Sequence, residues 1–350
     1  MDEDSAGLTS SLAVSVVIAA FSMDRWDGLR EVTASVRAQT VRVHETVVVI
    51  DHNPRLMAKA VSELPEVTVV ANAGGRGASA ARNTGAAASR GEVLAFLDDD
   101  VVARPNWLAA LLPQLQDPAV VGVGGRLEPL WETRRPRWFP PEFDWVLGCS
   151  YRGMPESATH VRNVWSSNMA IRRQAFEAVG GFRDGFGKVG ARNRPEDTDL
   201  CLQAAECNGG GTWIYEPDAI AGHRVPIRRT ALSYFVRRCY YEGHGKAELA
   251  SFNGMTDSTS TERQYVRCVL PRAIIRGLRE TGLGKVSGVA RSFATFIGLS
   301  FAAVGFAVGH TAGHVMERHG STKRTIRRPP LRQGDSVPGA AHQTSPGNAG

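Results

Sequence analysis

The sequence contains few cysteines and no CxxC pair. Its five cysteines are scattered and odd in number: Cys149, Cys201, Cys207, Cys239 and Cys268. Zinc ribbons and redox motifs need closely spaced cysteines, and small secreted domains need an even set, so we expect neither a structural zinc site nor a disulfide framework. This usage favours a reducing compartment. The first residues, MDEDSAGLTSS, are acidic and polar, which argues against a cleaved secretory signal.

The sequence also lacks a nucleic-acid recognition motif. Its net charge of +6 would allow nucleic acid, an anionic membrane surface or phosphorylated substrates as partners. The arginines are scattered, however, and an acidic cluster at Asp98–Asp100 opposes a polyanion. We therefore expect no nucleic-acid partner. A nucleic-acid-binding protein and a non-catalytic scaffold stay as remote alternatives.

Short apolar runs alternate with helical patterns in the first third of the chain. Apolar residues recur at helical spacing from Trp26 to Val36, and an alanine-rich stretch covers 78–89. This alternation predicts an α/β fold with a mainly parallel sheet flanked by helices. The runs expected as buried strands are Val14–Ala20, Thr46–Ile50, Val67–Ala71, Val93–Leu97 and Ala119–Gly125.

Three adjacent acids, Asp98, Asp99 and Asp100, directly follow the run Val93–Leu97. Neighbouring carboxylates resist burial unless a cation or hydrogen-bond donors offset their charge. In an extended chain Asp98 and Asp100 would point to the same side, an arrangement suited to Mg²⁺ or Mn²⁺. The alternative is a solvated acidic turn before a helix. The end of a buried strand favours the metal site, because open α/β sheets bind ligands at that edge.

Four other features are weaker candidates when each is taken alone. Asp51 ends a strand, where it could be a ligand or a turn residue. Gly74–Gly77 could hold a phosphate, but it matches neither GxGxxG nor GxxxxGK[ST] and could be a simple turn. The acids of Pro195–Asp199 (PEDTD) could complement a helix dipole. His223 could be a metal ligand or a structural histidine.

Two stretches lose regular periodicity. Residues 126–160 are rich in Pro, Trp and Arg, including RRPRWFPPEFDW. A long irregular stretch in a compact domain is usually functional, so this one could frame an acceptor site or could be only an insertion. Glycines from Asp184 to Gly190 predict a mobile loop.

Taken in order, these pieces resemble family 2 glycosyltransferases of the GT-A fold. The matching stretches span about residues 12–225: SVVIAA, VVVIDHNP, AARNTGAA after the glycine loop, GEVLAFLDDD, SSNMAIRRQAFEAVGGF and PEDTDLC. Each is weak alone, whereas the ordered set is specific. Within the family, FSMDRWDGL, RWFPPEFDWVLGCSYRG, VRNVWSSN and YFVRRCYYEGHGK are most similar to glucosyl-dolichyl phosphate glucuronosyltransferases and their bacterial relatives.

The resemblance implies roles in binding a nucleotide-sugar donor. Asp51 is expected to contact the nucleobase, and Arg82 to lie near the nucleotide. Asp98 and Asp99 are expected to contact the donor. The implied ligands of a Mg²⁺ or Mn²⁺ ion on its pyrophosphate are Asp98, Asp100 and His223.

The resemblance also implies the reaction. Asp197 is expected to be the base of an inverting transfer, with Glu196 as the less favoured candidate. The expected enzyme moves a sugar from a nucleotide-sugar donor, with UDP the favoured nucleotide, to a hydroxyl of a lipid-linked or glycan acceptor. The alternative is direct transfer to a polyprenyl phosphate.

The C-terminal third predicts an attachment to membranes. Residues 227–245 mix aromatic and basic side chains, and 292–315 carry no formal charge apart from protonation of two histidines. The second segment reaches the length of a bilayer span, so it could span a membrane, lie at its surface or pack in the fold. Basic residues flank both of its ends and give no orientation. We expect a cytoplasmic protein at the inner face of the cell membrane.

These observations divide the chain into five parts. A polar N-terminus and a basic, Pro- and Gly-rich tail are expected to be disordered. The expected parts are a disordered 1–12, a GT-A catalytic domain at 13–225, a basic and aromatic helical extension at 226–285, a membrane-associated helix at 286–318 and a disordered tail at 319–350.

Overall fold

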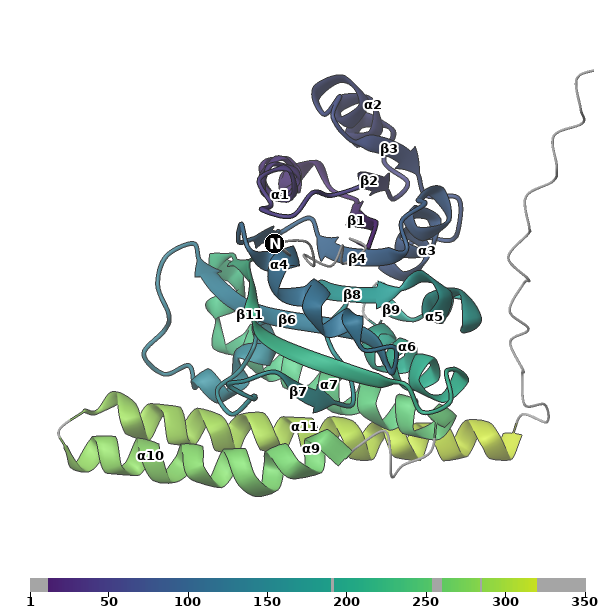
Figure 1. Ribbon diagram of the computed structural model, residues 1–350. Helices are drawn as coiled ribbons and strands as arrows, with labels where there is room; N and C mark the ends of the chain where they lie inside the picture. Colours follow the sequence, from purple (N-terminus) through teal and green to yellow (C-terminus); the bar gives the residue numbers. More distant parts are fainter. Residues whose placement is uncertain (1–11, 190–191, 254–259, 284, 320–350) are drawn as a thin grey trace, which may run out of the picture.

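The computed structural model describes residues 12–189, 192–253, 260–283 and 285–319. The predictions for the N-terminus and the tail therefore lie almost wholly outside the described residues. One large sheet runs through the molecule in the order β3-β2-β1-β4-β8-β6-β11-β5, with β7 beside β11 (Figure 1). Its strands are β1 (Val14–Ala20), β2 (Glu45–Ile50), β3 (Thr68–Ala71), β4 (Val93–Asp98), β5 (Val101–Ala103), β6 (Val120–Trp131), β7 (Thr159–Val161), β8 (Asn168–Arg172) and β11 (Thr212–Val225).

The sheet is parallel where the sequence predicts it. Strand β1 pairs in parallel with β2 and β4, β2 does so with β3, and β6 does so with β11. Antiparallel pairs are formed by β8 and by the short strands β5 and β7. The carboxyl ends of β1, β2 and β4 consequently meet at one edge, which confirms the predicted α/β architecture.

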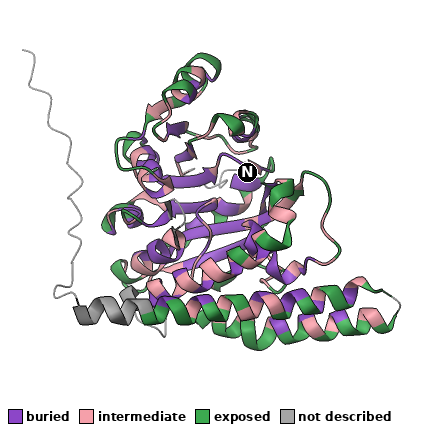
Figure 2. Cartoon of the chain, turned by 180° about the vertical axis from the view of Figure 1, so that it is seen from behind, coloured by how far each residue is buried: buried purple, intermediate pink, exposed green. Residues whose placement is uncertain are grey.

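Helices cover both faces of this sheet. Residues Val14, Val16 and Ile18 of β1 pack into a core on one face, with residues of α1, α2 and α4, while Val17 joins a second core on the other face. This alternation is that of a strand buried on both sides, as Figure 2 shows for the interior of the sheet. The helices are α1 (Trp26–Arg37), α2 (Pro54–Glu63), α3 (Ala78–Ala88), α4 (Trp107–Leu111), α5 (Arg173–Ala178) and α6 (Glu196–Cys207).

The two stretches without periodicity are more ordered than predicted. Strand β6 continues to Trp131, and a 3₁₀ helix covers Pro141–Leu147. Aromatic side chains explain the order, because Phe139 and Phe143 pack on Phe235 in a third core. The mobile loop predicted from Asp184 to Gly190 is wrong for Gly187–Val189, which forms β9 and pairs with β10 (Arg192–Arg194).

The chain after β11 is helical. It contains a 3₁₀ turn (Ile227–Thr230), α7 (Leu232–Asn253), α9 (Ser260–Gln264), a π-helical turn (Tyr265–Val269), α10 (Leu270–Gly282) and α11 (Ser287–His319). Helices α10 and α11 form an antiparallel hairpin along the base of the molecule, with α11 packed on α7 (Figure 1). The predicted domain boundary at residue 225 coincides with the end of β11, while the division into separate domains stays a prediction.

Glycines allow α7 and α11 to pack closely. A Cβ atom added at Gly243 of α7 would overlap the backbone oxygen of Ala302, and one added at Gly305 of α11 would overlap that of Tyr240. Backbone atoms cannot move aside as flexible side chains do. Only glycine therefore fits at these crossings.

We expect Gly243→Ala to destabilise the protein by about 1–3 kcal/mol, the usual cost of overpacking, despite the better helix propensity of alanine. The free energy of unfolding in urea, followed by circular dichroism, measures this. Gly282→Ala is the matched control, because a Cβ there meets no atom within 4 Å. Equal stability of the two variants would contradict the close packing.

Candidate functional site

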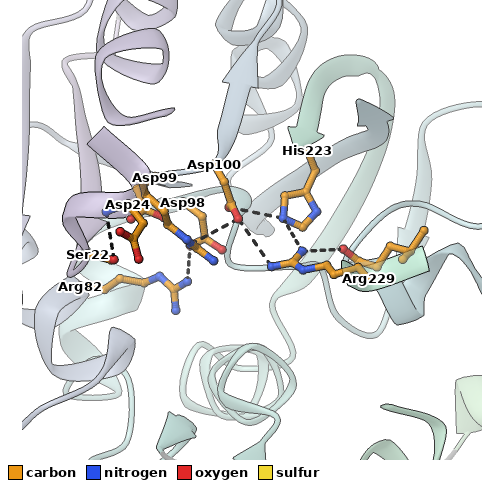
Figure 3. Close-up of polar contacts among 10 residues, drawn as sticks. Ser22, Asp24, Arg82, Asp98, Asp99, Asp100, His223 and Arg229 are labelled. Atoms are coloured by element: carbon orange, nitrogen blue, oxygen red, sulfur yellow. Dashed lines mark hydrogen bonds and ion pairs between the residues drawn. The ribbon is translucent and has the colours of Figure 1, made fainter. Parts of the chain in front are cut away.

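The three acids lie in a turn at the carboxyl end of β4. The strand ends at Asp98, and the chain turns through Asp99 and Asp100 before β5 begins. Figure 3 shows the three side chains with Arg82, His223 and Arg229 beside them. Arg82 Nη2 donates to Asp98 Oδ1 at 2.6 Å, and Arg25 Nη1 donates to Asp99 Oδ1 at 2.6 Å. Because the backbone turns, the same-side geometry predicted for an extended chain does not hold.

His223 reaches Asp100 through the pairing of two strands. β5 is antiparallel to β11, and this register places His223 opposite Val101. The His223 ring nitrogen Nε2 lies 3.3 Å from Asp100 Oδ1. Its other nitrogen, Nδ1, lies 3.6 Å from the Cys149 sulfur. Gly148, at φ +80°, leaves room for the ring, since an added Cβ would lie 2.8 Å from it.

The predicted metal set is only partly brought together. Asp100 and His223 converge, whereas Asp98 turns to Arg82. Within the described ranges, no group of three or more His, Cys, Asp or Glu side chains is arranged to hold a metal ion. The turn at Asp99 separates the first and third carboxylates. The ligand set Asp98, Asp100 and His223 stays a prediction.

Cations of the chain surround the Asp100 carboxylate. Arg25 Nη1 lies 3.3 Å from Asp100 Oδ2, and Arg229 Nη2 lies 3.6 Å from it. Burial alone would raise the pKa of Asp100, but the contacts with His223, Arg25 and Arg229 hold it well below its usual range. Asp100 is therefore a carboxylate that attracts positive charge.

The pKa of Asp99 is shifted in the opposite direction from that of Asp100. Burial raises its pKa to about 7, although Arg25 opposes this shift. Its Oδ2 atom is buried and has no hydrogen-bond partner among the described residues. Asp100 therefore favours the ionised form, whereas burial favours the neutral form of Asp99.

Asp51 organises the glycine loop. Its Oδ1 accepts a hydrogen bond from Asn72 Nδ2 at 2.7 Å, and its Oδ2 accepts one from the backbone N–H of Gly77 at 2.9 Å. Together with the contact to His52, these bonds outweigh burial and lower the pKa of Asp51. Gly77, at φ +128°, immediately precedes α3. Asp51 therefore connects the end of β2 to the loop.

Arg82 links two parts of the site. It is buried on α3, and its guanidinium lies over the Phe182 ring. One of its nitrogens contacts Asp98, and the other lies 3.3 Å from Glu196 Oε1 at the start of α6. A single cation thus joins the acids after β4 to those of PEDTD.

Glu196 and Asp197 face different partners. Glu196 contacts Arg82, whereas Asp197 accepts a hydrogen bond from the backbone N–H of Thr198 at 2.7 Å and lies beside Lys246 of α7. Burial and the charge of Asp197 raise the pKa of Glu196 to about 7. Burial also raises the pKa of Asp197, with the Lys246 charge opposing the shift. Asp199 of the same motif pairs with Arg183, a structural role.

Sequence reasoning missed several charged residues at this site. Arg25 and Arg229 come from two short 3₁₀ turns, Met23–Arg25 and Ile227–Thr230, that are distant in the sequence. Lys246 Nζ lies 3.4 Å from Thr198 Oγ1 and 2.9 Å from Glu262, whose two oxygens also accept from Arg162. The signal that could have pointed to Lys246 is its place at the end of the stretch YFVRRCYYEGHGK.

Comparison with known proteins identifies the family. Residues 15–180 match the glycosyl transferase family 2 model. The chain is 33% identical over 240 residues to the glucosyl-dolichyl phosphate glucuronosyltransferase of Haloferax volcanii. The aligned region covers 67% of this chain and 76% of that protein. It is 28% identical over 238 residues to the succinoglycan biosynthesis protein ExoM of Rhizobium meliloti, covering 65% and 73% of the two chains.

A solved structure shows the same fold. It is a mannosyltransferase from Pyrobaculum calidifontis in complex with GDP-Man and Mn²⁺, with a TM-score of 0.55 and 17% sequence identity, covering 85% of this chain and 88% of that one. This likeness bears on architecture alone, while the sequence relatives bear on activity. Together they confirm the resemblance drawn from the motifs. The chain therefore belongs to glycosyltransferase family 2, and it is a glycosyltransferase (EC 2.4) of the GT-A fold that uses nucleotide-sugar donors.

Proposed function

We propose that this enzyme transfers a sugar, with inversion and in a divalent-metal-dependent reaction, from a UDP-linked donor to a hydroxyl of a lipid-linked acceptor. The observation that carries the proposal is the Arg82 bridge between Asp98 and Glu196. It holds the acids after β4, which suit a donor diphosphate and its metal, next to the acids of α6, one of which can take a proton. Both halves of a transfer reaction thus lie at one sheet edge.

Asp100 and His223 lie close enough together to hold one metal ion as two protein ligands. Asp100 would supply a carboxylate oxygen and His223 an imidazole nitrogen to a bound Mg²⁺ or Mn²⁺ ion. Asp100 also attracts the positive charges of Arg25 and Arg229. A bound ion would supply charge neutralisation for the leaving diphosphate.

The chain's own residues account for the remaining steps. In this proposal Asp51 contacts the nucleobase and orders the glycine loop, while Asp98, Asp99 and Arg82 position the donor. Asp197 takes the proton of the acceptor hydroxyl as that oxygen attacks the anomeric carbon and the bond from this carbon to the nucleoside diphosphate breaks. The neighbouring Glu196 forms an ion pair with Arg82, which contacts the donor in this proposal. Asp197 is therefore the acid that faces Lys246 of α7.

The acceptor is proposed from the similar protein of Haloferax volcanii, whose name includes a dolichyl phosphate. A lipid-linked acceptor would place this enzyme at a membrane surface, and the proposed location is the cytoplasmic face of the cell membrane. A screen of UDP- and GDP-sugars with Mn²⁺, Mg²⁺ or chelator, and with lipid extract as acceptor, tests the proposal. We expect nucleoside diphosphate release and a glycosidic product only with metal. Product in which the sugar is attached directly to lipid phosphate would favour the polyprenyl-phosphate alternative.

The charge of Lys246 gives a testable pH dependence. A base must be ionised, so kcat falls as the pH drops below the pKa of Asp197. Because Lys246 lowers this raised pKa, Lys246→Met should move the acid limb of the kcat profile to higher pH, with activity recovering in alkaline buffer. Profiles from about pH 5 to about pH 9 measure this shift. Lys246→Arg keeps the charge and should restore the limb. An unshifted limb in Lys246→Met would contradict the assignment of Asp197.

A further inference from the structure

The outward face of α11 is apolar although it is exposed. Most of the exposed large hydrophobic side chains in the described part of the chain lie between Val266 and Val308. On α11 they recur at helical spacing as Val289, Phe293, Phe296, Phe301, Val304 and Val308. A surface helix of a soluble protein normally carries charged residues on this side. Scattered exposed hydrophobics need no explanation, whereas a continuous stripe marks an interaction site.

The stripe continues over the turn of the hairpin onto α10. Leu283 and Val286, next to the turn, are 79% and 81% exposed, more than any other large hydrophobic residue described. Ile275 and Leu278 of α10 are exposed as well. We call the exposed apolar residues from Ile275 to Val308 the hairpin face. Figure 2 shows the exposed surfaces of both helices along the base of the molecule.

Positive charge borders the hairpin face. Arg267, Arg272, Arg279 and Lys285 are exposed. The one acid between Tyr265 and Thr311 is Glu280, which is partly buried and paired with Arg291. An apolar stripe beside exposed basic residues is the pattern of a helix lying at an anionic lipid surface. A second copy of the chain fits less well, because a two-fold contact would bring like charges together.

We propose that the α10–α11 hairpin lies flat in the interface of an anionic bilayer, with the hairpin face inserted below the headgroups. The inner side of α11 is already occupied, since Gly298 packs against Phe143 and Phe235, and Gly305 packs on Tyr240. The helix Ser287–Thr311 is long and apolar enough to cross a membrane by length and composition. Spanning would require α11 to leave α7, whereas lying flat keeps every one of these contacts.

This arrangement explains how the site could reach a lipid-linked substrate. Helix α7 contacts the hairpin through Gly243, which packs on Ala302, and contacts the catalytic region through Lys246, beside Thr198. One helix, about 10 Å across, therefore separates the bilayer surface from Asp197. The proposal itself concerns lipid binding, so it can fail or succeed independently of the acceptor assigned above.

Sedimentation of the full chain with vesicles tests the lipid surface. Vesicles of phosphatidylcholine with phosphatidylglycerol should bind the protein, and binding should weaken at high salt or with phosphatidylcholine alone. The double variant Phe293→Glu with Phe296→Glu should lower affinity at least about tenfold, because it removes two inserted aromatic rings. Val61→Glu is the matched control, since Val61 is 57% exposed on α2, and α2 lies at the end of the molecule far from the hairpin (Figure 1). Equal losses in both variants, or none, would overturn the proposal.

Depth measurements distinguish a flat helix from a spanning one. Nitroxide labels are placed in turn at Phe293→Cys, Phe301→Cys and Val308→Cys, with the exposed cysteines Cys207 and Cys268 changed to serine. A flat helix puts all three labels at the same shallow depth. A spanning helix puts position 301 deep, because positions 293 and 308 are about 22 Å apart along the axis.

Sedimentation velocity without lipid tests whether a second copy of the chain covers the hairpin face instead. The proposal would be overturned if the protein formed a stable dimer that the Phe293→Glu and Phe296→Glu changes disrupt, and if it bound no vesicles.

Discussion

Asp100→Asn is expected to lower kcat/KM about 10²–10³-fold, the usual effect of removing one group that stabilises charge in the transition state. Asp100 is the carboxylate on which His223, Arg25 and Arg229 converge, and its low pKa keeps it ionised. An amide keeps the shape but loses the negative charge. Initial rates at varied Mn²⁺ concentration measure the loss, and circular dichroism checks the fold.

Two further variants define the role of Asp100. Asp218→Asn removes an exposed acid five residues before His223 on β11, and it should retain full activity. His223→Gln should resemble Asp100→Asn, and the double variant should be little worse than either, because residues that act as a unit are not additive. Full activity of Asp100→Asn, or of the unmodified enzyme in excess chelator, would remove the metal from the mechanism.

Asp197→Asn is expected to lower kcat by about 10²–10⁴-fold, the span for a positioned acid or base. Donor affinity should survive, because in this proposal the donor is held by Asp51, Asp98 and Arg82 and not by Asp197. Glu196→Gln should instead weaken donor binding, since it removes a partner of Arg82. Calorimetric titration of nucleoside diphosphate beside turnover measurements separates the two effects.

Glu206→Gln is the control for this pair of variants, because Glu206 is exposed at the opposite end of α6. It should change neither kcat nor donor affinity. If Asp197→Asn instead lost donor affinity at unchanged kcat, Asp197 would be a binding residue. If Glu196→Gln alone lost kcat, the proton acceptor would be Glu196.

The sequence predicted the sheet well because its signals are local. The run VSVVIAA is apolar at successive positions, and a strand buried on both faces needs that composition. Asp51 directly follows β2 and Asp98 ends β4, and the parallel pairing of β1 with β2 and β4 brings the two strand ends to one edge. A local pattern and one topological rule therefore predicted that these two acids lie at one edge of the sheet.

Other features depend on contacts that no local pattern records. The turn after Asp98 separates carboxylates that an extended chain would align. Arg25, in the 3₁₀ turn that follows β1, stabilises it by pairing with Asp99. Lys246 reaches the α6 acids only because α7 packs beside them. The order of the segment around Pro141–Leu147 comes from Phe143 meeting Phe235, about ninety residues later in the chain.

The same limit applies to the C-terminal helix. Composition left spanning, surface and buried positions open for 292–315, because each requires an apolar segment. The packing of Gly298 and Gly305 separates an inner side from an outer side of α11. Only that division reveals which apolar residues are already used within the fold and which remain exposed.

The anomeric configuration of the product tests the proposed mechanism most directly. The enzyme is given a nucleotide sugar of known configuration, Mn²⁺ and acceptor, and the purified product is examined by proton NMR. Direct attack of an acceptor hydroxyl activated by Asp197 predicts an anomeric centre inverted relative to the donor. A product that retains the donor's configuration would contradict single displacement and the role proposed for Asp197.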